Sequence, residues 1–419
     1  TLASRAVYQN YLDYRTKFGK LNFAGVAGVD YETLDFNNTS LAGTGFPSDD
    51  FTFLASAADF TDASQDVSES RLLSLYTRLN FRYLGKYALT ATFRSDGSSR
   101  FGADNRFGYF PSVSLGWILH EEPFLQNLDW VNQLKLRVSY GLTGNQAGIG
   151  DFASRGLASG GNNYQGLAGI SPVTFANVDL QWESTSELNL GLDFGIWGDR
   201  LHGSVDYYVK NTRDLLLLRP LPSSTGFEGI NQNVGEIRNA GVELGLTGLI
   251  VDRDVRWTLR GMLAANRNEV TALFEGQGFS PVTFLPIRVD EGEPLAYFFG
   301  LRSLGVDPQT GDLIFEDVNG DGEIDDADNQ RIGSPHPDFI GSLSSELTYK
   351  GLSLDVLVNF LQGNEILNFT RTFTEDGLLN GFNNSTRILD AWSAPGDVTD
   401  VPRIGGPNAT ANRNSRTSR

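Results

Sequence analysis

The chain has 419 residues, and 33 Lys plus Arg against 51 Asp plus Glu give it a formal net charge of −18. This balance argues against a nucleic-acid partner, because phosphate contacts need clustered Lys and Arg. Apolar residues make up 40% of the chain, which excludes wholesale disorder. The absence of cysteine excludes disulfides, thiolate metal sites and a cysteine nucleophile. No stretch approaches the roughly 18 apolar residues of a transmembrane helix.

Glycine and aromatic residues are abundant, with 47 Gly, 28 Phe and 14 Tyr, which favours β-structure with many turns. Apolar residues recur with a period of two, as side chains do on one face of a strand. No long helix is predicted. The pattern predicts an all-β chain of about a dozen strands, each of roughly 9–11 residues, a length that crosses a bilayer when the strand is tilted. In chain order these strands fall at 21–29, 73–83, 87–93, 113–117, 134–140, 188–194, 201–207, 242–246, 257–263, 343–349 and 352–360.

The predicted connections alternate in length. Short links at 84–85, 195–199, 250–254 and 350–351, and an intermediate link at 119–132, fall at one end of the strands. Long links at 31–71, 95–109, 142–185, 211–239 and 266–339 fall at the other end. This parity is typical of an up-and-down antiparallel barrel with short periplasmic turns and long extracellular loops.

Aromatic residues lie near the predicted strand ends, where a girdle at the bilayer interface would need them. They are Tyr83, Tyr87, Trp197 and Tyr349 at the short-turn end, and Tyr140 and Tyr207 at the other. The pattern alone leaves open a secreted β-solenoid or a tandem array of β-sandwiches.

Several blocks of sequence together resemble the C-terminal barrel portion of SusC/RagA-type TonB-dependent outer-membrane transporters. The resemblance covers nearly the whole chain, and the blocks occur in the family's order. Each block is weak alone, but the ordered set is specific. The blocks are Arg94-Ser-Asp-Gly-Ser-Ser-Arg-Phe-Gly102, Gly108-Tyr-Phe-Pro-Ser-Val-Ser-Leu-Gly-Trp117, Leu134 to Gln146, Leu180-Gln-Trp-Glu183, Asp206-Tyr-Tyr208, Leu221 to Phe227, Asn233-Val-Gly235, Asn239-Ala-Gly-Val-Glu243, Ile332-Gly-Ser-Pro-His-Pro337 and Ala391-Trp392.

The resemblance implies a 22-stranded barrel with a plug domain in the outer membrane of a Bacteroidota-type bacterium. It implies import of large nutrients, mostly glycans and in some cases peptides. A SusD-like surface lipoprotein would capture the ligand, and the TonB complex would act on the plug. These partners, together with outer-membrane lipid, are expectations from the family.

The sequence departs from the family pattern, because we find no signal segment, plug or TonB-contacting segment and no closing strands after residue 419. We therefore expect residues 1–419 to be a fragment of a TonB-dependent receptor β-barrel domain. About a dozen strands cannot close such a barrel, and open sheet edges are not tolerated in lipid. This piece alone is not expected to transport anything.

One loop matches the twelve-residue calcium pattern, in which oxygen ligands stand at positions 1, 3 and 5 and Gly at position 6 allows a sharp turn. The candidate calcium ligands are Asp317, Asn319, Asp321, Glu323 and Asp328. Position 12 is Asp rather than the usual Glu, so the side chain at this position is shorter and its carboxylate reaches less far towards the ion. A solvated Asn/Asp/Gly-rich turn without metal is the alternative. No other cofactor is expected.

Polar strand residues should face the lumen, where they would contact substrate or plug or stand in water. They are Arg78, Arg82, Arg94, Lys135, Arg137 and Arg260. The loop aromatics Tyr164 and Phe279 could stack on sugars but are more often loop anchors. No enzyme is predicted: His120, His202 and His336 are widely spaced, catalytic motifs are absent, and the pair Glu121-Glu122 reads as a hydrated turn.

The sequence thus favours the barrel wall and extracellular loops of an outer-membrane importer of glycans or peptides. The first alternative is a calcium-stabilised extracellular adhesin or glycan-binding protein without transport activity, which would be soluble without detergent. The second is a surface glycosidase, which would release sugar. Cargo identity does not follow from the fold.

Overall fold

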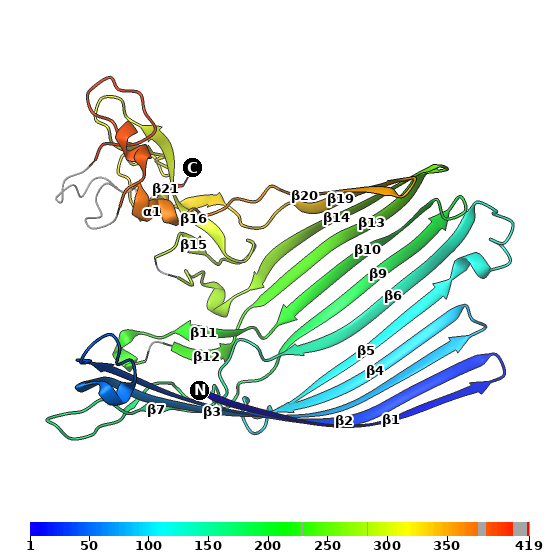
Figure 1. The fold of residues 1–419 in the computed structure, drawn as a ribbon, viewed down its shortest axis with the longest axis horizontal. Helices are drawn as coiled ribbons and strands as arrows, with labels where there is room; N and C mark the ends of the chain where they lie inside the picture. The colour runs from blue at the N-terminus through cyan, green and yellow to red at the C-terminus, as the bar shows by residue number, and fades with distance from the viewer. Residues whose placement is uncertain (228, 283, 376–382, 405–416, 419) are drawn as a thin grey trace. The chain divides into compact units, whose positions relative to one another are not determined.

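The computed structural model describes residues 1–227, 229–282, 284–375, 383–404 and 417–418, and it is built around one sheet of 12 strands. The order of these strands across the sheet is the same as their order along the chain (Figure 1). In order, the strands are β1 (Leu2–Phe18), β2 (Leu21–Thr44), β3 (Asp59–Tyr83), β4 (Tyr87–Ser98), β5 (Phe107–Ile118), β6 (Val131–Asn145), β9 (Glu183–Ile196), β10 (Leu201–Arg213), β13 (Glu236–Asp252), β14 (Val255–Ala272), β19 (Phe339–Tyr349) and β20 (Leu352–Gln362).

The period-two pattern gives this sheet one apolar face and one polar face. In the antiparallel pair of β3 and β4, Leu79 stands opposite Ala91 and Phe81 opposite Leu89, while Arg78 stands opposite Thr92 on the other face. The apolar face remains open to the surroundings of the protein. Its members include Phe93, Leu115, Leu190 and Leu343, each more than a third exposed. An apolar face of this extent is stable only against another apolar medium, as in a bilayer.

The connections confirm the predicted parity. Turns at 19–20, 84–86, 119–130, 197–200, 253–254 and 350–351 join the strands at one end of the sheet. Longer loops at 45–58, 99–106, 146–182, 214–235 and 273–338 join them at the other. Gly85, with φ +76°, adopts the left-handed conformation that a two-strand turn of this kind requires.

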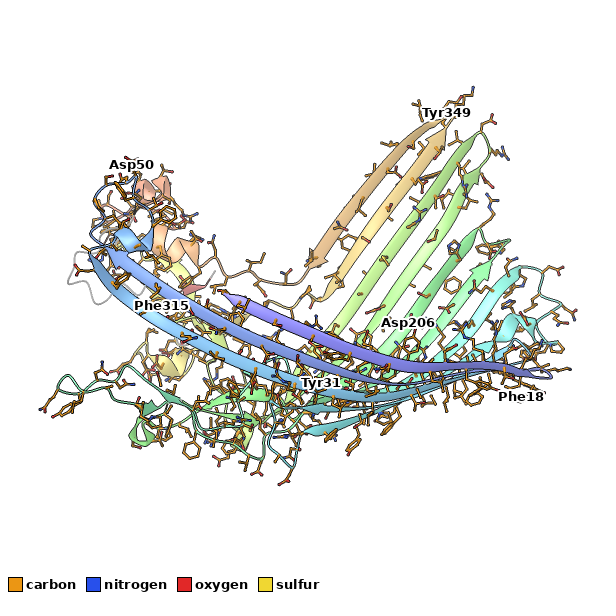
Figure 2. All side chains as sticks on the ribbon, turned by 60° about the horizontal axis from the view of Figure 1, so that its bottom comes forward. Phe18, Tyr31, Asp50, Asp206, Phe315 and Tyr349 are labelled. Atoms are coloured by element: carbon orange, nitrogen blue, oxygen red, sulfur yellow. The ribbon has the colours of Figure 1, made fainter. Side chains whose placement is uncertain are left out.

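The predicted aromatic girdle is visible at the short-turn end. The rings of Tyr83 and Tyr87 stack at 6.4 Å between centroids, and those of Tyr87 and Trp117 at 6.3 Å. Phe18 lies at the same end of β1, and Tyr349 ends β19 beside its turn (Figure 2). Exposed aromatic residues at strand ends are typical of the boundary between lipid and water.

Smaller elements occupy the long loops. The two-residue strands β7 (Ala158–Ser159) and β8 (Ser171–Pro172) pair, as do β11 (Leu216–Pro220) and β12 (Gly229–Asn233). A further small sheet contains β15 (Ile287–Arg288), β16 (Tyr297–Val306), β17 (Leu313–Phe315), β18 (Gln330–Gly333) and β21 (Thr417–Ser418). The helical elements are α1 (Thr370–Thr374) and the 3-10 turns η1 (Leu54–Ser56), η2 (Leu119–Glu121), η3 (Ser223–Thr225), η4 (Phe274–Gly276), η5 (Asp326–Asp328) and η6 (Thr386–Asp390). Within the described ranges, no helix is long and apolar enough to cross a membrane.

One of the first strands was missed, and one prediction about this region was wrong. The strand β1 was not predicted, although it pairs with β2 along its whole length from Leu2 to Phe18. The expected long link from 31 to 71 is mostly strand, because β2 continues to Thr44 and β3 begins at Asp59. The extended part of this hairpin has a polar, weakly alternating sequence, so backbone pairing rather than amphipathicity defines it.

The chain divides into two compact units, one of residues 1–236 with 244–252 and one of residues 237–243 with 253–419. In each described unit the buried apolar side chains lie mainly in the loops. Phe101 and Leu180 are 1% and 0% exposed in the first unit, and Val289 and Leu301, both within the long link 273–338, are 3% and 4% exposed in the second. The loops are therefore packed bodies rather than loose connections.

Candidate functional site: the polar face of the sheet and its long loops

The polar face of the sheet is continuous from β3 to β10. Arg78 on β3 stands opposite Thr92 on β4, and Thr92 stands opposite Ser112 on β5. The pairing of β5 with β6 then places Lys135 and Arg137 on the same face. Because alternate residues share a face, Arg82 and Arg94 belong to it as well. All the cations predicted on strands of the first unit thus share one face. In the second unit, Arg260 pairs across the polar face of β14 and β19 with Glu346, at 2.9 Å.

A triad of charges lies on this face where β6, β9 and β10 run side by side. Arg137 donates from Nη2 to Asp193 and to Asp206, in each case at 2.9 Å. Its Nε also donates to Asp193 at 3.0 Å, so that contact is bidentate. Lys135 lies 3.8 Å from the same carboxylate. Sequence analysis had not identified either Asp as a partner, because the register between strands is not visible in one sequence.

Two of the sequence blocks meet in a small core at the long-loop end. Phe101, Leu180 and Trp182 come from two different loops, and Ile149, Ala153 and Leu216 complete the cluster. The ring of Trp182 packs 5.0 Å from Phe101, and its Nε1 donates to the Arg106 carbonyl at 2.8 Å. These motif residues therefore hold loops together rather than contact a ligand.

A partly buried polar network, centred on the buried Tyr297, stabilises the loops of the second unit. Asp290 accepts hydrogen bonds from Arg288 at 2.6 Å and from the Tyr297 hydroxyl at 2.5 Å. Burial, together with the hydrogen bond to Asp290, raises the pKa of Tyr297, which is 5% exposed. Arg331 extends the network to Glu293 at 2.6 Å. The phenol is thus a fixed hydrogen donor.

The last two sequence blocks are docked on the same unit by hydrogen bonds. Ser334 donates its backbone N–H to Glu365 at 2.7 Å, and His336 Nε2 lies 2.7 Å from the Leu295 carbonyl. Trp392 donates from Nε1 to the Pro308 carbonyl at 2.9 Å. These blocks, like those of the first unit, have structural roles.

The predicted calcium loop forms a set of carboxylate-capped turns. Asp317 accepts hydrogen bonds from the backbone of Gly320 and Gly322, at 2.6 and 2.9 Å. Asp328 is fully buried and accepts from the Val318 and Asp325 backbones, both at 2.9 Å. These bonds hold the pKa of the Asp328 carboxyl below its usual range.

The remaining candidate ligands lie in the middle of this loop. Asn319 donates to Asp321 at 2.9 Å, and Asp321 accepts from the Glu323 backbone at 2.8 Å. Over the residues that the structure describes, no group of three or more His, Cys, Asp or Glu side chains comes together as a metal site. Calcium binding by this loop stays a prediction.

The structure also shows the environment of the other residues singled out in the sequence, which are Glu122 and the two loop aromatics. Glu122 is 8% exposed and accepts hydrogen bonds from Tyr87 and Trp117, at 2.7 and 3.2 Å, so its prediction as a hydrated residue was wrong. These bonds lower the pKa of the Glu122 carboxyl. Of the two loop aromatics, Tyr164 is 75% exposed at a hairpin tip, whereas Phe279 is half-buried and pairs through its backbone with Val289.

Comparison with known proteins agrees with this architecture. The family model described as TonB dependent receptor-like, beta-barrel matches residues 2–298. The TonB-dependent receptor P39 of Formosa agariphila is 32% identical, over 94% of this chain and 43% of the relative. The TonB-dependent receptor SusC of Bacteroides thetaiotaomicron is 32% identical, over 82% of this chain and 36% of its own length. A solved structure of the RagAB peptide transporter superimposes with a TM-score of 0.87 at 30% identity, over 96% of this chain and 46% of that one.

The chain thus spans less than half the length of these relatives. The family comprises transporters and receptors of the outer membrane rather than enzymes, which argues against the glycosidase alternative. The apolar outer face, the polar inner face and the alternating connections are what a barrel of this kind requires. By the extent and identity of these matches, the chain belongs to the TonB-dependent receptor β-barrel family and is SusC-like.

Proposed function

We propose that this chain forms the barrel wall and extracellular loops of an outer-membrane importer of large nutrients, either glycans or peptides. The observation that carries the proposal is the match of the barrel to SusC and RagAB over most of the chain. It is supported by a sheet with one lipid-compatible face and one face lined with charged and hydroxyl side chains. Such a face suits a water-filled passage for polar cargo.

A SusD-like surface lipoprotein and the TonB complex are the proposed partners. The long loops at one end of the strands are packed bodies with their own cores, which suits them to receive a folded partner. Energy from the TonB complex would reach the passage through a plug domain. The adhesin alternative gains no support from the relatives.

Uptake by cells tests the proposal. The full-length gene should be deleted from its host, and growth should be measured on a panel of oligosaccharides and of peptides. We expect loss of growth on one member of the panel and its restoration by the full-length gene. An uncoupler of the proton gradient should block uptake, because import of this kind needs energy. Unchanged growth on every member of the panel would contradict the proposal.

Purification of the transporter from its own membrane tests the partner separately. The tagged protein should be extracted in mild detergent, and its companions should be identified by mass spectrometry. We expect one surface lipoprotein in stoichiometric amount. A matched tagged barrel from the same membrane serves as the control for nonspecific lipoprotein capture. Recovery of the importer alone would rule out a stable lipoprotein partner.

A further inference from the structure

The link between β5 and β6, residues 119–130, begins on the apolar side of the sheet. Tyr87 on β4 and Trp117 on β5 stand opposite each other, and alternation places both side chains on the apolar face. Glu122 accepts hydrogen bonds from the Tyr87 hydroxyl at 2.7 Å and from Trp117 Nε1 at 3.2 Å. Lys86 lies 3.6 Å from the same carboxylate. The buried carboxylate therefore holds the link against the aromatic girdle.

Hydrogen bonds also fix the shape of this link, which lies at the short-turn end of the sheet (Figure 1). Lys86, which precedes β4, donates from Nζ to the Glu121 carbonyl at 2.6 Å. At the other side, the backbone N–H of Leu134 on β6 donates to His120 Nδ1 at 3.1 Å. Within the link, backbone hydrogen bonds close successive turns. The positions of its exposed side chains are therefore set by the fold.

The link and the next turn along the sheet expose large apolar side chains. Phe124 is 66% exposed and Trp130 is 51% exposed, and Leu128 is exposed as well. Trp197, in the turn between β9 and β10, is 59% exposed, and its backbone N–H donates to the Trp130 carbonyl at 2.8 Å. Such a group of side chains is unfavourable in water, whereas a membrane–water interface accommodates it well.

The surroundings of this side of the sheet follow from the strand order. β4, β5 and β6 have strands of the same sheet on both sides, so further barrel strands can join only at the edges formed by β1 and β20. A plug inside the barrel would lie against the opposite, polar face. The exposed apolar row that includes Leu89 and Leu115 leads to Tyr87 and Trp117, and from there to the link. The link is thus continuous with the surface that meets lipid.

We propose that the 119–130 link is a membrane anchor that lies at the boundary between phospholipid headgroups and acyl chains. Short turns of such barrels face the periplasm, so the leaflet is the inner one of the outer membrane. Phe124 and Trp130 contact the lipid, and Glu122 is the positioning residue that holds the link on the outer side. The anchor extends the girdle from the strand ends into a connection. The inference goes beyond the proposed import function and is independent of cargo.

Depth measurements on the full-length transporter test the anchor. The protein is reconstituted in vesicles of phosphatidylethanolamine and phosphatidylglycerol, with a nitroxide attached to one cysteine introduced by F124C, L115C or S64C. Unsubstituted protein carried through the same labelling gives the background. Electron paramagnetic resonance then measures collisions of the nitroxide with oxygen, which concentrates among acyl chains, and with a water-soluble nickel chelate.

The two reference positions bracket the expected result. Leu115 lies on the exposed apolar face of β5, so a label there should collide mainly with oxygen. Ser64 lies in the exposed extension of β3, so a label there should collide mainly with nickel. We expect the label at position 124 to show an intermediate ratio, as at the depth of the headgroups.

The substitution E122A tests the positioning role. Without the bonds to Tyr87 and Trp117 the link should leave the girdle, and nickel collisions at position 124 should about double. The matched control is E121A, because Glu121 accepts hydrogen bonds from Lys86 and Gln126 through its backbone carbonyl, which the substitution keeps. It should leave the collisions unchanged. Heat modifiability in detergent gels checks that the barrel of each variant is folded.

Two outcomes would overturn the anchor. Nickel collisions at position 124 as frequent as those at position 64 would place the link in the periplasm. Protection of position 124 from both oxygen and nickel would mean that a protein, either the plug or a periplasmic partner, covers the link. Unchanged collisions in the E122A variant would reject Glu122 as the positioning residue. The uptake panel tests the import function separately, whatever the depth of this link.

Discussion

Arg137 on β6 reaches across β9 and binds Asp206 on β10 at 2.9 Å, because Gly191 lies directly between them. The register places Gly191 opposite both residues, on the face that carries their side chains. A Cβ at this glycine would stand 2.5 Å from the Arg137 guanidinium carbon and 2.6 Å from an Asp206 carboxylate oxygen. The missing side chain therefore makes room for the ion pair. Asp206 lies on this sheet in Figure 2.

We expect Gly191→Ala to destabilise the barrel. The methyl group would displace the Arg137 guanidinium and leave Asp206 without its partner, at a cost of about 1–3 kcal/mol. The lower unfolding temperature can be measured by heat modifiability of the full-length protein in detergent gels. Gly261→Ala is the matched control, since a Cβ at that strand position meets nothing within 4 Å. Equal stability of both variants would show that the crossing contact is unimportant.

Trp182→Ala should loosen the loop core of the first unit. The substitution removes ring packing on Phe101 and Phe110, at 5.0 and 5.5 Å, and the hydrogen bond to Arg106. Because the ring is only partly buried, its loss should cost less than the roughly 3–5 kcal/mol of a fully buried aromatic side chain. Cleavage by an external protease within 146–182 should become faster in whole cells.

Tyr164→Ala is the control for that experiment. The Tyr164 side chain lies in the same loop but is 75% exposed, so its removal should leave the cleavage rate unchanged. If both variants were cleaved at the native rate, the cluster around Trp182 would not hold the loop.

Alternation of side chains was sufficient to predict most of the sheet. Rows such as Leu188, Leu190 and Leu192 are regular, and the structure places them on one face of β9. In β1 the same period is present in Leu12, Tyr14 and Phe18, but Tyr11 falls on the opposite face and obscures it. The extension of β2 beyond Tyr31 could not be predicted, because its pairing depends on backbone hydrogen bonds with β3.

The candidate site was less predictable than the fold. The sequence identifies Arg137 as a polar-face residue, but its pairing with Asp193 and Asp206 depends on register across three strands. The motif residues Phe101 and Trp182 are recognisable as family features, yet a family motif does not reveal whether a residue packs or binds. Only their burial in one cluster identifies their structural role.

Acid should loosen the loop that contains Asp328. Backbone hydrogen bonds from Asp325 and Val318 lower the pKa of this carboxyl, so the folded loop prefers the ionised form. Its contribution to stability is fully present above the unfolded pKa near 3.8 and is lost as pH falls towards the lower folded value. Hydrogen exchange of residues 316–330, corrected for intrinsic rates, should therefore increase below that pH.

Asp328→Asn provides the comparison for the acid experiment. The amide cannot ionise, so the variant should exchange faster at neutral pH and show less change on acidification. An unchanged pH profile in the variant would mean that another carboxyl in this loop is responsible.

Calcium binding is the remaining prediction for the loop at 317–328. Asp317, Asn319 and Asp321 have the spacing of oxygen ligands in calcium loops, and hydrogen bonds within the loop already hold them in tight turns. We expect calcium to bind the full-length protein and to slow hydrogen exchange in this segment. Calorimetric titration of protein stripped with a chelator gives the affinity, which should be modest because Asp328 replaces the usual longer Glu.

The double variant D317N/D321N should abolish the heat of calcium binding, because it removes two of the negative charges that attract the ion. Asp397→Asn is the matched control: this carboxylate also caps a turn, accepting from the Ser393 and Ala394 backbones, but lies outside the loop. It should leave the titration unchanged. No heat at millimolar calcium in the native protein would make the loop a metal-free turn, in which Asp317 and Asp328 act only as acceptors for backbone N–H groups.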